Sequence, residues 1–482
     1  MSVRRIRRGL RRALGLVLMI AAASSARAWH VLTDPLHAEP PALTTGVTLP
    51  GDGAPVLCPA SEDFSKPLSL ADAVDAALCD NPQIQAAWAD IKVQAAALGE
   101  ARAAYLPTLS ATAGVLHSNT NYPGSGIPAT VTHGNTVYGA FSWRLFDFGE
   151  RQANLRSANA LLTAALASHD AALQQTLAEV IQDYFDAVTK RATWQAKIQD
   201  GAIAHQTLEV ARRREAGGTA TRNDILQATT AYARATLDRN RAEGKYEKAV
   251  AVLTYAMGVP MQTHLILEND VNSQDRLGTK DLEGWLHTAE THYPAIIAAR
   301  AQWRAAQEKV VATRSEGLPT VDLEANYYQN GYPGQGLSNL PTHVRTVGVM
   351  LTIPIFNGFS QTYAVKKARA QAEQLKADME DTEHNVLMEV VEAYADATSS
   401  LRNLRSSEVL LQTAQASLAS SQRRYAKGAA SILEILNAQA ALASAKQERI
   451  RSLADWRSAR LRLLADAGVL GRTAVSSAPM HP

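Results

Sequence analysis

The amino-acid sequence repeats itself once, with an offset of about 210 residues, and this duplication limits the folds open to the chain. Each half must supply the same helices and strands in the same order. We therefore divide the chain into two structural repeats, 68–260 and 281–470, joined by 261–280. The recurring positions include Phe146 and Phe356, Tyr184 and Tyr394, Gly218 and Gly428, Leu226 and Leu436, and Gly258 and Gly468.

Each half contains one very long helical pattern followed by a shorter one. Apolar residues recur every three, four or seven positions through the first long pattern, which is typical of a coiled-coil seam. A helix of about 66 residues extends on the order of 100 Å. The sequence predicts long helices at 150–215 and 360–426, shorter returning helices at 221–256 and 431–466, and a single opening helix over 68–105.

Stretches between the helices alternate apolar and polar residues, which is the period of a β-strand with one apolar face. In 135–146, Val137 and Phe141 fall on the same face, and 319–330 and 345–355 alternate in the same way. With the duplication, this pattern predicts two strands in each half and four in the chain.

Two short stretches predict sharp reversals between the long and short helices. They read "RREAGGTATRNDILQATTAY" and, 210 residues later, "RRYAKGAASILEILNAQAAL". Glycine allows the left-handed backbone that ends a helix. Thr221 with Asp224, and Ser431 with Glu434, then fit the capping-box pattern that begins the next helix.

The first 28 residues have the layout of a secretory signal peptide, although an N-terminal membrane anchor is the alternative. This leader holds seven of the 48 basic residues and no acidic one. The remaining 41 basic and 46 acidic residues give a net charge of −5, which offers no support for a nucleic-acid partner. Residues 29–67 are assigned to an N-terminal extension and 471–482 to a C-terminal tail.

The chain contains two cysteines, Cys58 and Cys79. An exported chain meets oxidising conditions, where disulfides form and persist. We therefore expect a Cys58–Cys79 disulfide, with two unpaired thiols as the alternative.

The alternating strands predict a membrane-spanning structure that needs several copies of the chain. No apolar run of 18 residues follows the leader, so no transmembrane helix is expected. Strands cannot sit in lipid with open edges, and four strands cannot close a barrel. Two copies would supply eight strands and three would supply twelve, and the composition leaves both open.

Several motifs resemble those of the TolC family of outer-membrane efflux and secretion channels. They are the Asn-Pro pair near the start, "LPT", "LFDFG" and "PIFNGF" before the long helices, and "RYAKGAASILEILNAQ", within a match over about 68–470. The resemblance implies a mostly α-helical homotrimer with a twelve-stranded transmembrane β-barrel and an α-helical periplasmic tunnel. The segment from Leu78 to Ala111 is most similar to the branch that serves type I protein secretion, such as the cyclolysin exporter.

The same resemblance implies roles for residues at the second reversal. Glu434 and Asn437 match two acidic ring positions that constrict the pore, the second being neutral here. Asp224 and Tyr425 match a carboxylate and a tyrosine that link neighbouring helix pairs in the closed state. The linking arginine of the family corresponds to Ala430, so that part of the link is missing or moved, and Arg222 or Lys427 could take its place. The capping role alone also accounts for Asp224 and Glu434.

The resemblance further implies a periplasmic adaptor protein that docks at the tips, and an inner-membrane ABC transporter or proton-driven pump behind it. A solvated helix end is the alternative explanation for the basic residues there. The candidate adaptor contacts are Gly217, Gly218, Gly428, Ala429, Arg214 and Arg424.

The sequence contains no motif of an enzyme or a cofactor site. It has no P-loop, no HExxH and no Cys/His cluster, so we expect no catalysis, no cofactor and no metal. The leading hypothesis is a passive outer-membrane exit duct for type I secretion. Small-molecule efflux through the same duct and a periplasmic coiled-coil scaffold are the alternatives.

Overall fold

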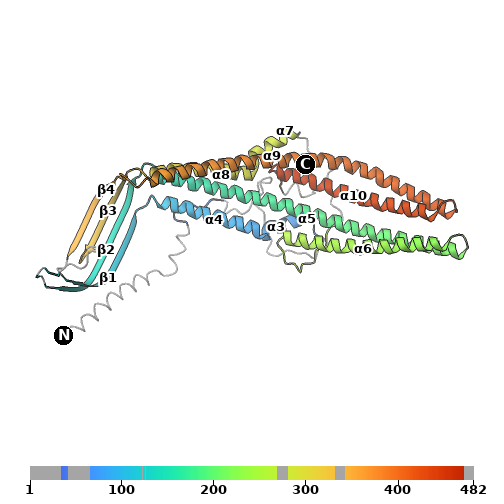
Figure 1. The fold of residues 1–482 in the computed structure, drawn as a ribbon, viewed down its shortest axis with the longest axis horizontal. Coiled ribbons are helices and arrows are strands. Elements are labelled where there is room, and N and C mark those ends of the chain that lie inside the picture. The colour runs from blue at the N-terminus through green and yellow to red at the C-terminus, as the bar shows by residue number, and fades with distance from the viewer. Residues whose placement is uncertain are drawn as a thin grey trace, which may run out of the picture. The chain divides into compact units, whose positions relative to one another are not determined.

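The computed structural model describes residues 34–41, 66–121, 123–124, 126, 128–268, 281–331 and 342–471. The predicted signal peptide, Cys58 and nearly all of the predicted C-terminal tail lie outside these residues, so the leader and the Cys58–Cys79 bridge stay predictions. Figure 1 shows the described helices and strands with their labels. The chain divides into two units. One unit contains the strands with the adjoining helix ends, and the other contains the remaining parts of the helices.

The described helices and strands repeat one order twice, which confirms a mostly α-helical, duplicated fold with four strands. No described helix combines the length and the apolar character needed to cross a lipid bilayer. In chain order the elements are α3 (Leu70–Asp80), α4 (Pro82–Ala103), β1 (Thr108–Thr120), β2 (Thr130–Phe146), α5 (Glu150–Ala216), α6 (Arg222–Ala256), α7 (Leu282–His292), α8 (Pro294–Ser315), β3 (Thr320–Gln329), β4 (His343–Thr352), α9 (Ser360–Ala426) and α10 (Ile432–Asp466).

The prediction of a single opening helix over 68–105 is wrong. Helix α3 ends before Asn81, whose backbone is extended, and α4 begins at Pro82. Proline lacks an amide proton and disfavours helix in the residue before it, so an X-Pro step separates two helices readily. The side-chain amide of Asn81 donates a hydrogen bond of 3.1 Å to the carbonyl of Ala256 and fixes this break. The second half breaks in the same way at Tyr293, between α7 and α8.

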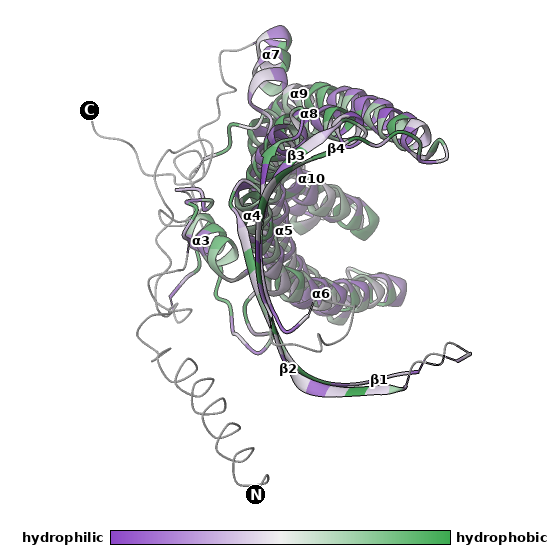
Figure 2. Ribbon diagram, turned by 90° about the vertical axis from the view of Figure 1, so that its left-hand side faces the viewer, coloured by the Kyte–Doolittle hydropathy of each residue, from purple (hydrophilic) through white to green (hydrophobic). Residues whose placement is uncertain are grey.

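The four strands form one antiparallel sheet in the order β1-β2-β3-β4. Val137 of β2 pairs with Gln329 of β3, which pairs with His343 of β4, so these three side chains share a face. The sheet curves across its width (Figure 2). Strands β1 and β4 are its edges, and each keeps one side without a partner strand in the described chain.

One face of this sheet is apolar and uncovered. Its residues include Leu109, Val115 and Val347, which are 81%, 77% and 77% exposed. Covering such a side chain contributes about 2 kcal/mol, so leaving the whole face in water is costly. The opposite face is polar and contains an ion pair between Arg144 and Asp322, with 3.0 Å between Nε and Oδ1.

The unit that holds most of the helices has its core around the middle of α5. Leu177, Ile181 and Tyr184 are buried there against α3 and α6. The Tyr184 hydroxyl donates a hydrogen bond of 3.1 Å to the carbonyl of Leu68. Around α9 a second cluster contains Trp456, which is fully buried. Each long helix is therefore anchored near its midpoint by a buried apolar cluster.

Candidate gate at the two helical tips

The two reversals have the same backbone geometry. Gly218 and Gly428 have φ values of 72° and 76°, in the left-handed region that glycine adopts without a side-chain clash. The next amide donates to a carbonyl five residues back, over 2.8 Å from Thr219 and 2.9 Å from Ala429. This bond is the mark of a Schellman turn. A Cβ at either glycine would meet nothing within 4 Å, so the backbone angle and not space requires glycine.

The caps that begin the returning helices differ. At the first tip, the Asp224 carboxylate accepts from the Thr221 amide over 2.8 Å, and Thr221 Oγ1 accepts from the Asp224 amide over 3.3 Å. This is a complete capping box. At the second tip, Ser431 Oγ accepts from the Glu434 amide over 3.3 Å, but the Glu434 carboxylate does not return to the cap. The prediction of a second complete capping box is therefore wrong.

The Glu434 carboxylate instead forms an ion pair within its own helical hairpin. Its Oε1 lies 2.9 Å from Nη1 of Arg424 and accepts a second bond of 3.3 Å from Ser421 Oγ. The Arg424 and Glu434 side chains are 57% and 35% exposed, so water screens much of this attraction. Asn437 follows one turn later on α10 and is exposed. The constriction role of Glu434 and Asn437 stays a prediction.

A contact between the two hairpins joins Arg214 to Tyr425. The Arg214 guanidinium lies 4.3 Å from the centre of the Tyr425 ring, and its Nη1 donates a 2.6 Å hydrogen bond to the Tyr425 carbonyl. Tyr425 is only 5% exposed, and burial raises the pKa of its hydroxyl. That hydroxyl has no hydrogen-bond partner in the described part of the chain, so it is not bonded to Asp224. Arg214, and not Arg222 or Lys427, is therefore the basic residue that contacts Tyr425 within the chain, while the gating role of Asp224 and Tyr425 stays a prediction.

Two more polar contacts continue this link along the hairpins. Gln439 Nε2 donates to Thr207 Oγ1 over 2.6 Å, and Lys446 Nζ lies 3.3 Å from Asp200 Oδ1. On α5 the three positions, Asp200, Thr207 and Arg214, are seven residues apart, which keeps them on one face. We call these three contacts, Arg214–Tyr425, Thr207–Gln439 and Asp200–Lys446, the ladder. The sequence analysis missed it, although polar residues spaced by seven in an alanine-rich seam indicate such contacts.

The remaining candidate tip residues lie in two exposed turns. Gly217, Gly218, Gly428 and Ala429 are all exposed, so a partner can reach this backbone. Arg214 is half-buried against the other hairpin. Adaptor contact at these positions stays a prediction.

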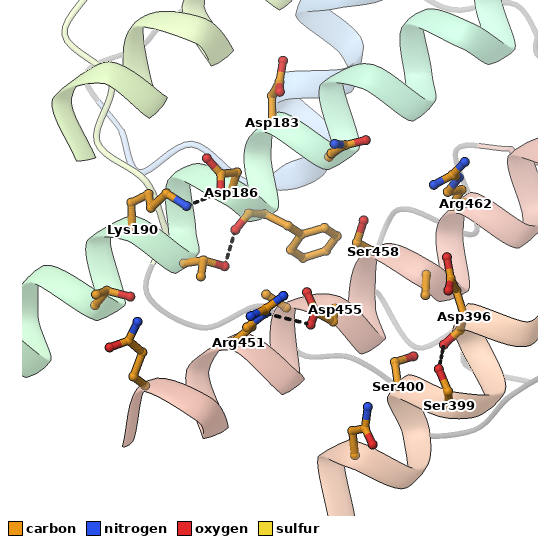
Figure 3. A pocket seen from close by; sticks show the side chains of 18 of the residues that line it. Asp183, Asp186, Lys190, Asp396, Ser399, Ser400, Arg451, Asp455, Ser458 and Arg462 are labelled. Atoms are coloured by element: carbon orange, nitrogen blue, oxygen red, sulfur yellow. Dashed lines mark hydrogen bonds and ion pairs between the residues drawn. The ribbon is translucent and has the colours of Figure 1, made fainter. Parts of the chain in front are cut away.

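A polar hollow of about 780 Å³ lies between α5, α9 and α10 (Figure 3). Acidic and basic side chains project into it, and Lys190 Nζ pairs with Asp186 Oδ1 over 2.8 Å. Burial and nearby acidic groups raise the pKa of Asp183 to about 6. These positions lie on the face of α5 opposite Tyr184, so the helix has one face in the core and one in water. Within the described residues, no three His, Cys, Asp or Glu side chains gather as a metal site.

Comparison with known proteins confirms the resemblance seen in the sequence. The chain is 33% identical over 440 residues to Protein CyaE of Bordetella pertussis, covering 91% of this chain and 92% of that protein. It is 25% identical over 416 residues to the alkaline protease secretion protein AprF of Pseudomonas aeruginosa, covering 84% and 85%. It is 22% identical over 427 residues to the outer membrane protein TolC of Escherichia coli, covering 84% and 83%.

A solved structure of the outer-membrane channel OprN has the same fold, with a TM-score of 0.75 at 18% identity over 86% of this chain and 98% of that one. The family model described as "Outer membrane efflux protein" matches residues 73–259 and 285–469. Channels of this kind reside in the outer membrane of Gram-negative bacteria, are not enzymes, and work with adaptor proteins and inner-membrane transporters. The chain belongs to the outer membrane efflux protein family.

Proposed function

We propose that three copies of this chain form a passive exit duct for type I protein secretion, with a twelve-stranded barrel in the outer membrane and an α-helical tunnel in the periplasm. The observation that carries this proposal is the four-stranded sheet, which has an uncovered apolar face and two unpaired edges. Strands β1 to β4 contain 13, 17, 10 and 10 residues, and about 9–11 suffice to cross a bilayer.

Edge pairing between copies explains why the chain works as an oligomer. In lipid, every strand edge must be paired, because no water is present to satisfy its amides and carbonyls. Pairing β4 of one copy with β1 of the next closes a ring. Three copies supply twelve strands, which leaves room for water inside, whereas eight strands are filled by side chains.

The polar surfaces supply the wall of this duct. The sheet face that contains Arg144 and Asp322 lines the barrel, and the polar hollow along α5 lines the tunnel. Because these walls are charged and hydrated, a polar cargo passes without losing its water. The chain carries no nucleotide-binding motif, so energy comes from an inner-membrane ABC transporter, coupled through a periplasmic adaptor at the tips.

The tips close this duct when no cargo is present. The Arg214–Tyr425 contact and the rest of the ladder join the two hairpins of each chain, which leaves Asp224 to face the neighbouring hairpin in the trimer. Glu434 and Asn437 narrow the entrance. We assign 68–260 and 281–470 to the two structural repeats and 261–280 to the joint between them.

Protein secretion is favoured over small-molecule efflux by the relatives. AprF is named for the secretion of a protease and matches most of this chain. Efflux of small molecules through a proton-driven pump is the second candidate, and the description of the family model supports it. A periplasmic scaffold without a barrel would leave the apolar sheet face in water.

Secretion by complementation tests the proposal. The full-length chain is expressed in a Gram-negative strain that lacks its own secretion duct but keeps an ABC transporter, an adaptor and their protein cargo. We expect the cargo to appear in the medium, and the purified protein to open ion-conducting pores in a planar bilayer. Restored drug resistance with the cargo retained would favour efflux, and a chain that never conducts would refute the duct altogether.

A further inference from the structure

Basic side chains lie near the loop ends of three strands on the apolar sheet face. His117 of β1 pairs directly with His133 of β2, with 6.4 Å between ring centroids. Arg345 of β4 pairs with Tyr327 of β3, and the Tyr327 hydroxyl lies 2.9 Å from Nδ1 of His343. The register places all five residues on the apolar face, because directly paired residues point to the same side. We call His117, His133, His343 and Arg345 the basic rim.

The basic rim borders the apolar band on the side of the two strand-connecting loops. On the same face, Val115 precedes His117 by two residues and Val347 follows Arg345 by two. The other border of the band, beside the helices, is aromatic: Phe146 contacts Phe148 with 4.7 Å between ring centroids, in a T-shaped arrangement. The band therefore has an aromatic border at its helix end and a basic border at its loop end.

No carboxylate of the four described strands lies on the face that carries the basic rim. The only acidic residues of the four strands, Asp322 and Glu324, alternate onto the opposite face. The loop sequences 121–129 and 330–342 contain no acidic residue. Strand β1 contains none either, so the next copy around a closed ring brings no counter-ion. Arg345 is exposed, and no ion pair involves it among the described residues.

We propose that the basic rim binds the phosphate groups of outer-leaflet lipid, whose acyl chains cover the apolar band below it. This inference rests on the proposed function, which places the helices in the periplasm and the loops at the cell surface. Guanidinium groups match phosphate oxygens with paired donors, and imidazole adds further N–H donors and charge when protonated. Basic side chains without an acidic partner on the same face, directly beside an uncovered apolar band, are the observation that selects this ligand.

The test measures lipid binding by the full-length protein in detergent. Native mass spectrometry follows the titration of bisphosphorylated lipid A, with its dephosphorylated form and inorganic phosphate as separate arms. We expect Arg345→Gln to weaken lipid A binding about fivefold, because one basic charge near an anionic surface contributes about that factor. His117→Asn/His133→Asn should weaken it further, and Arg345→Lys should recover most of the loss. Thr346→Gln, one residue along β4 on the opposite face, is the matched control.

Each outcome has a separate meaning. Equal binding of lipid A by the wild type and by Arg345→Gln would refute phosphate binding by the basic rim. Binding of dephosphorylated lipid A by the wild type as tightly as the bisphosphorylated form would refute it too. Inorganic phosphate that displaces lipid A at similar concentration would identify a free-anion site and overturn lipid as the ligand. Pore conductance should be unchanged in Arg345→Gln, since the rim lies outside the duct. Loss of conductance in the wild type itself would refute the proposed function, not the rim specifically.

Discussion

Replacing Arg214 by methionine tests whether the contact between the hairpins keeps the tips closed. Methionine keeps much of the aliphatic stem but removes the charge and all donors of the guanidinium. The variant loses the stacking on Tyr425 at 4.3 Å and the 2.6 Å bond to its carbonyl. We expect the wild-type protein to stay mostly closed and Arg214→Met to open more often.

The magnitude follows from the two lost interactions. A half-buried cation–π contact contributes about 1 kcal/mol, and a hydrogen bond from a charged donor contributes about 1.5 kcal/mol. In the variant, water can contact the Tyr425 ring and carbonyl, and this hydration offsets part of the loss. The closed state is then destabilised by about 2 kcal/mol in each chain. If each subunit opens separately and opening breaks its contact, the ratio of open to closed states rises about 30-fold for each subunit.

Single-channel recording in a planar bilayer measures this ratio directly. Arg213→Met is the matched control, because Arg213 is exposed one residue earlier on the same helix. Tyr425→Leu and the Arg214→Met/Tyr425→Leu double variant complete a double-mutant cycle. If the two residues act through one contact, their effects on the free energy of opening are not additive. Equal open times in Arg214→Met, Arg213→Met and the wild type would show that this contact has no part in gating.

Three further predictions concern the constriction, a buried carboxyl and a helix-ending glycine. Arg424→Gln frees the Glu434 carboxylate from its 2.9 Å ion pair, so block of the conductance by divalent cations should strengthen, and Glu434→Gln should weaken it; unchanged block in both excludes Glu434 from the constriction. Burial raises the pKa of the Asp466 carboxyl from 3.8 to about 6. The contribution of this carboxyl to the free energy of unfolding is therefore fully present below pH 4, where it is protonated, and is lost as the pH rises through 6. Asp466→Asn should then raise the free energy of unfolding at pH 7.5 by about 1–2 kcal/mol and change it little at pH 4, as measured by thermal unfolding; equal shifts at both pH values would contradict this. Gly468→Ala should lower the melting temperature more than Gly428→Ala, because only at Gly468 would the new Cβ lie 3.0 Å from backbone.

The long helices and the tips were predictable because their signals are local and regular. The heptad pattern of 150–215 and the glycine reversals placed both ends of α5 within a residue of the structure. Strand β2 begins at Thr130, five residues before the predicted 135, because the start of the strand, 130–134, contains Val131 as its one apolar side chain and so shows no alternation.

The contacts between tips were not predictable in the same way. The capping pattern of Ser431 and Glu434 matches that of Thr221 and Asp224, and only the fold shows that Arg424 attracts the second carboxylate away. The partner of Tyr425 lies 211 residues away on another hairpin. Local propensity contains no information on such a pairing, since it depends on how the two halves pack.

Arg214 and Arg424 occupy equivalent positions of the duplicated sequence, 210 residues apart, yet one reaches across to a tyrosine and the other neutralises a glutamate beside it. In a threefold ring the six hairpin ends would thus alternate between two kinds of surface. A partner with sixfold symmetry would therefore contact two chemically different surfaces. Each of its six identical binding surfaces would have to bind either kind of hairpin end. Gene duplication would in this way have given a threefold ring two chemically separate sets of contact points, each free to change by mutation without altering the other.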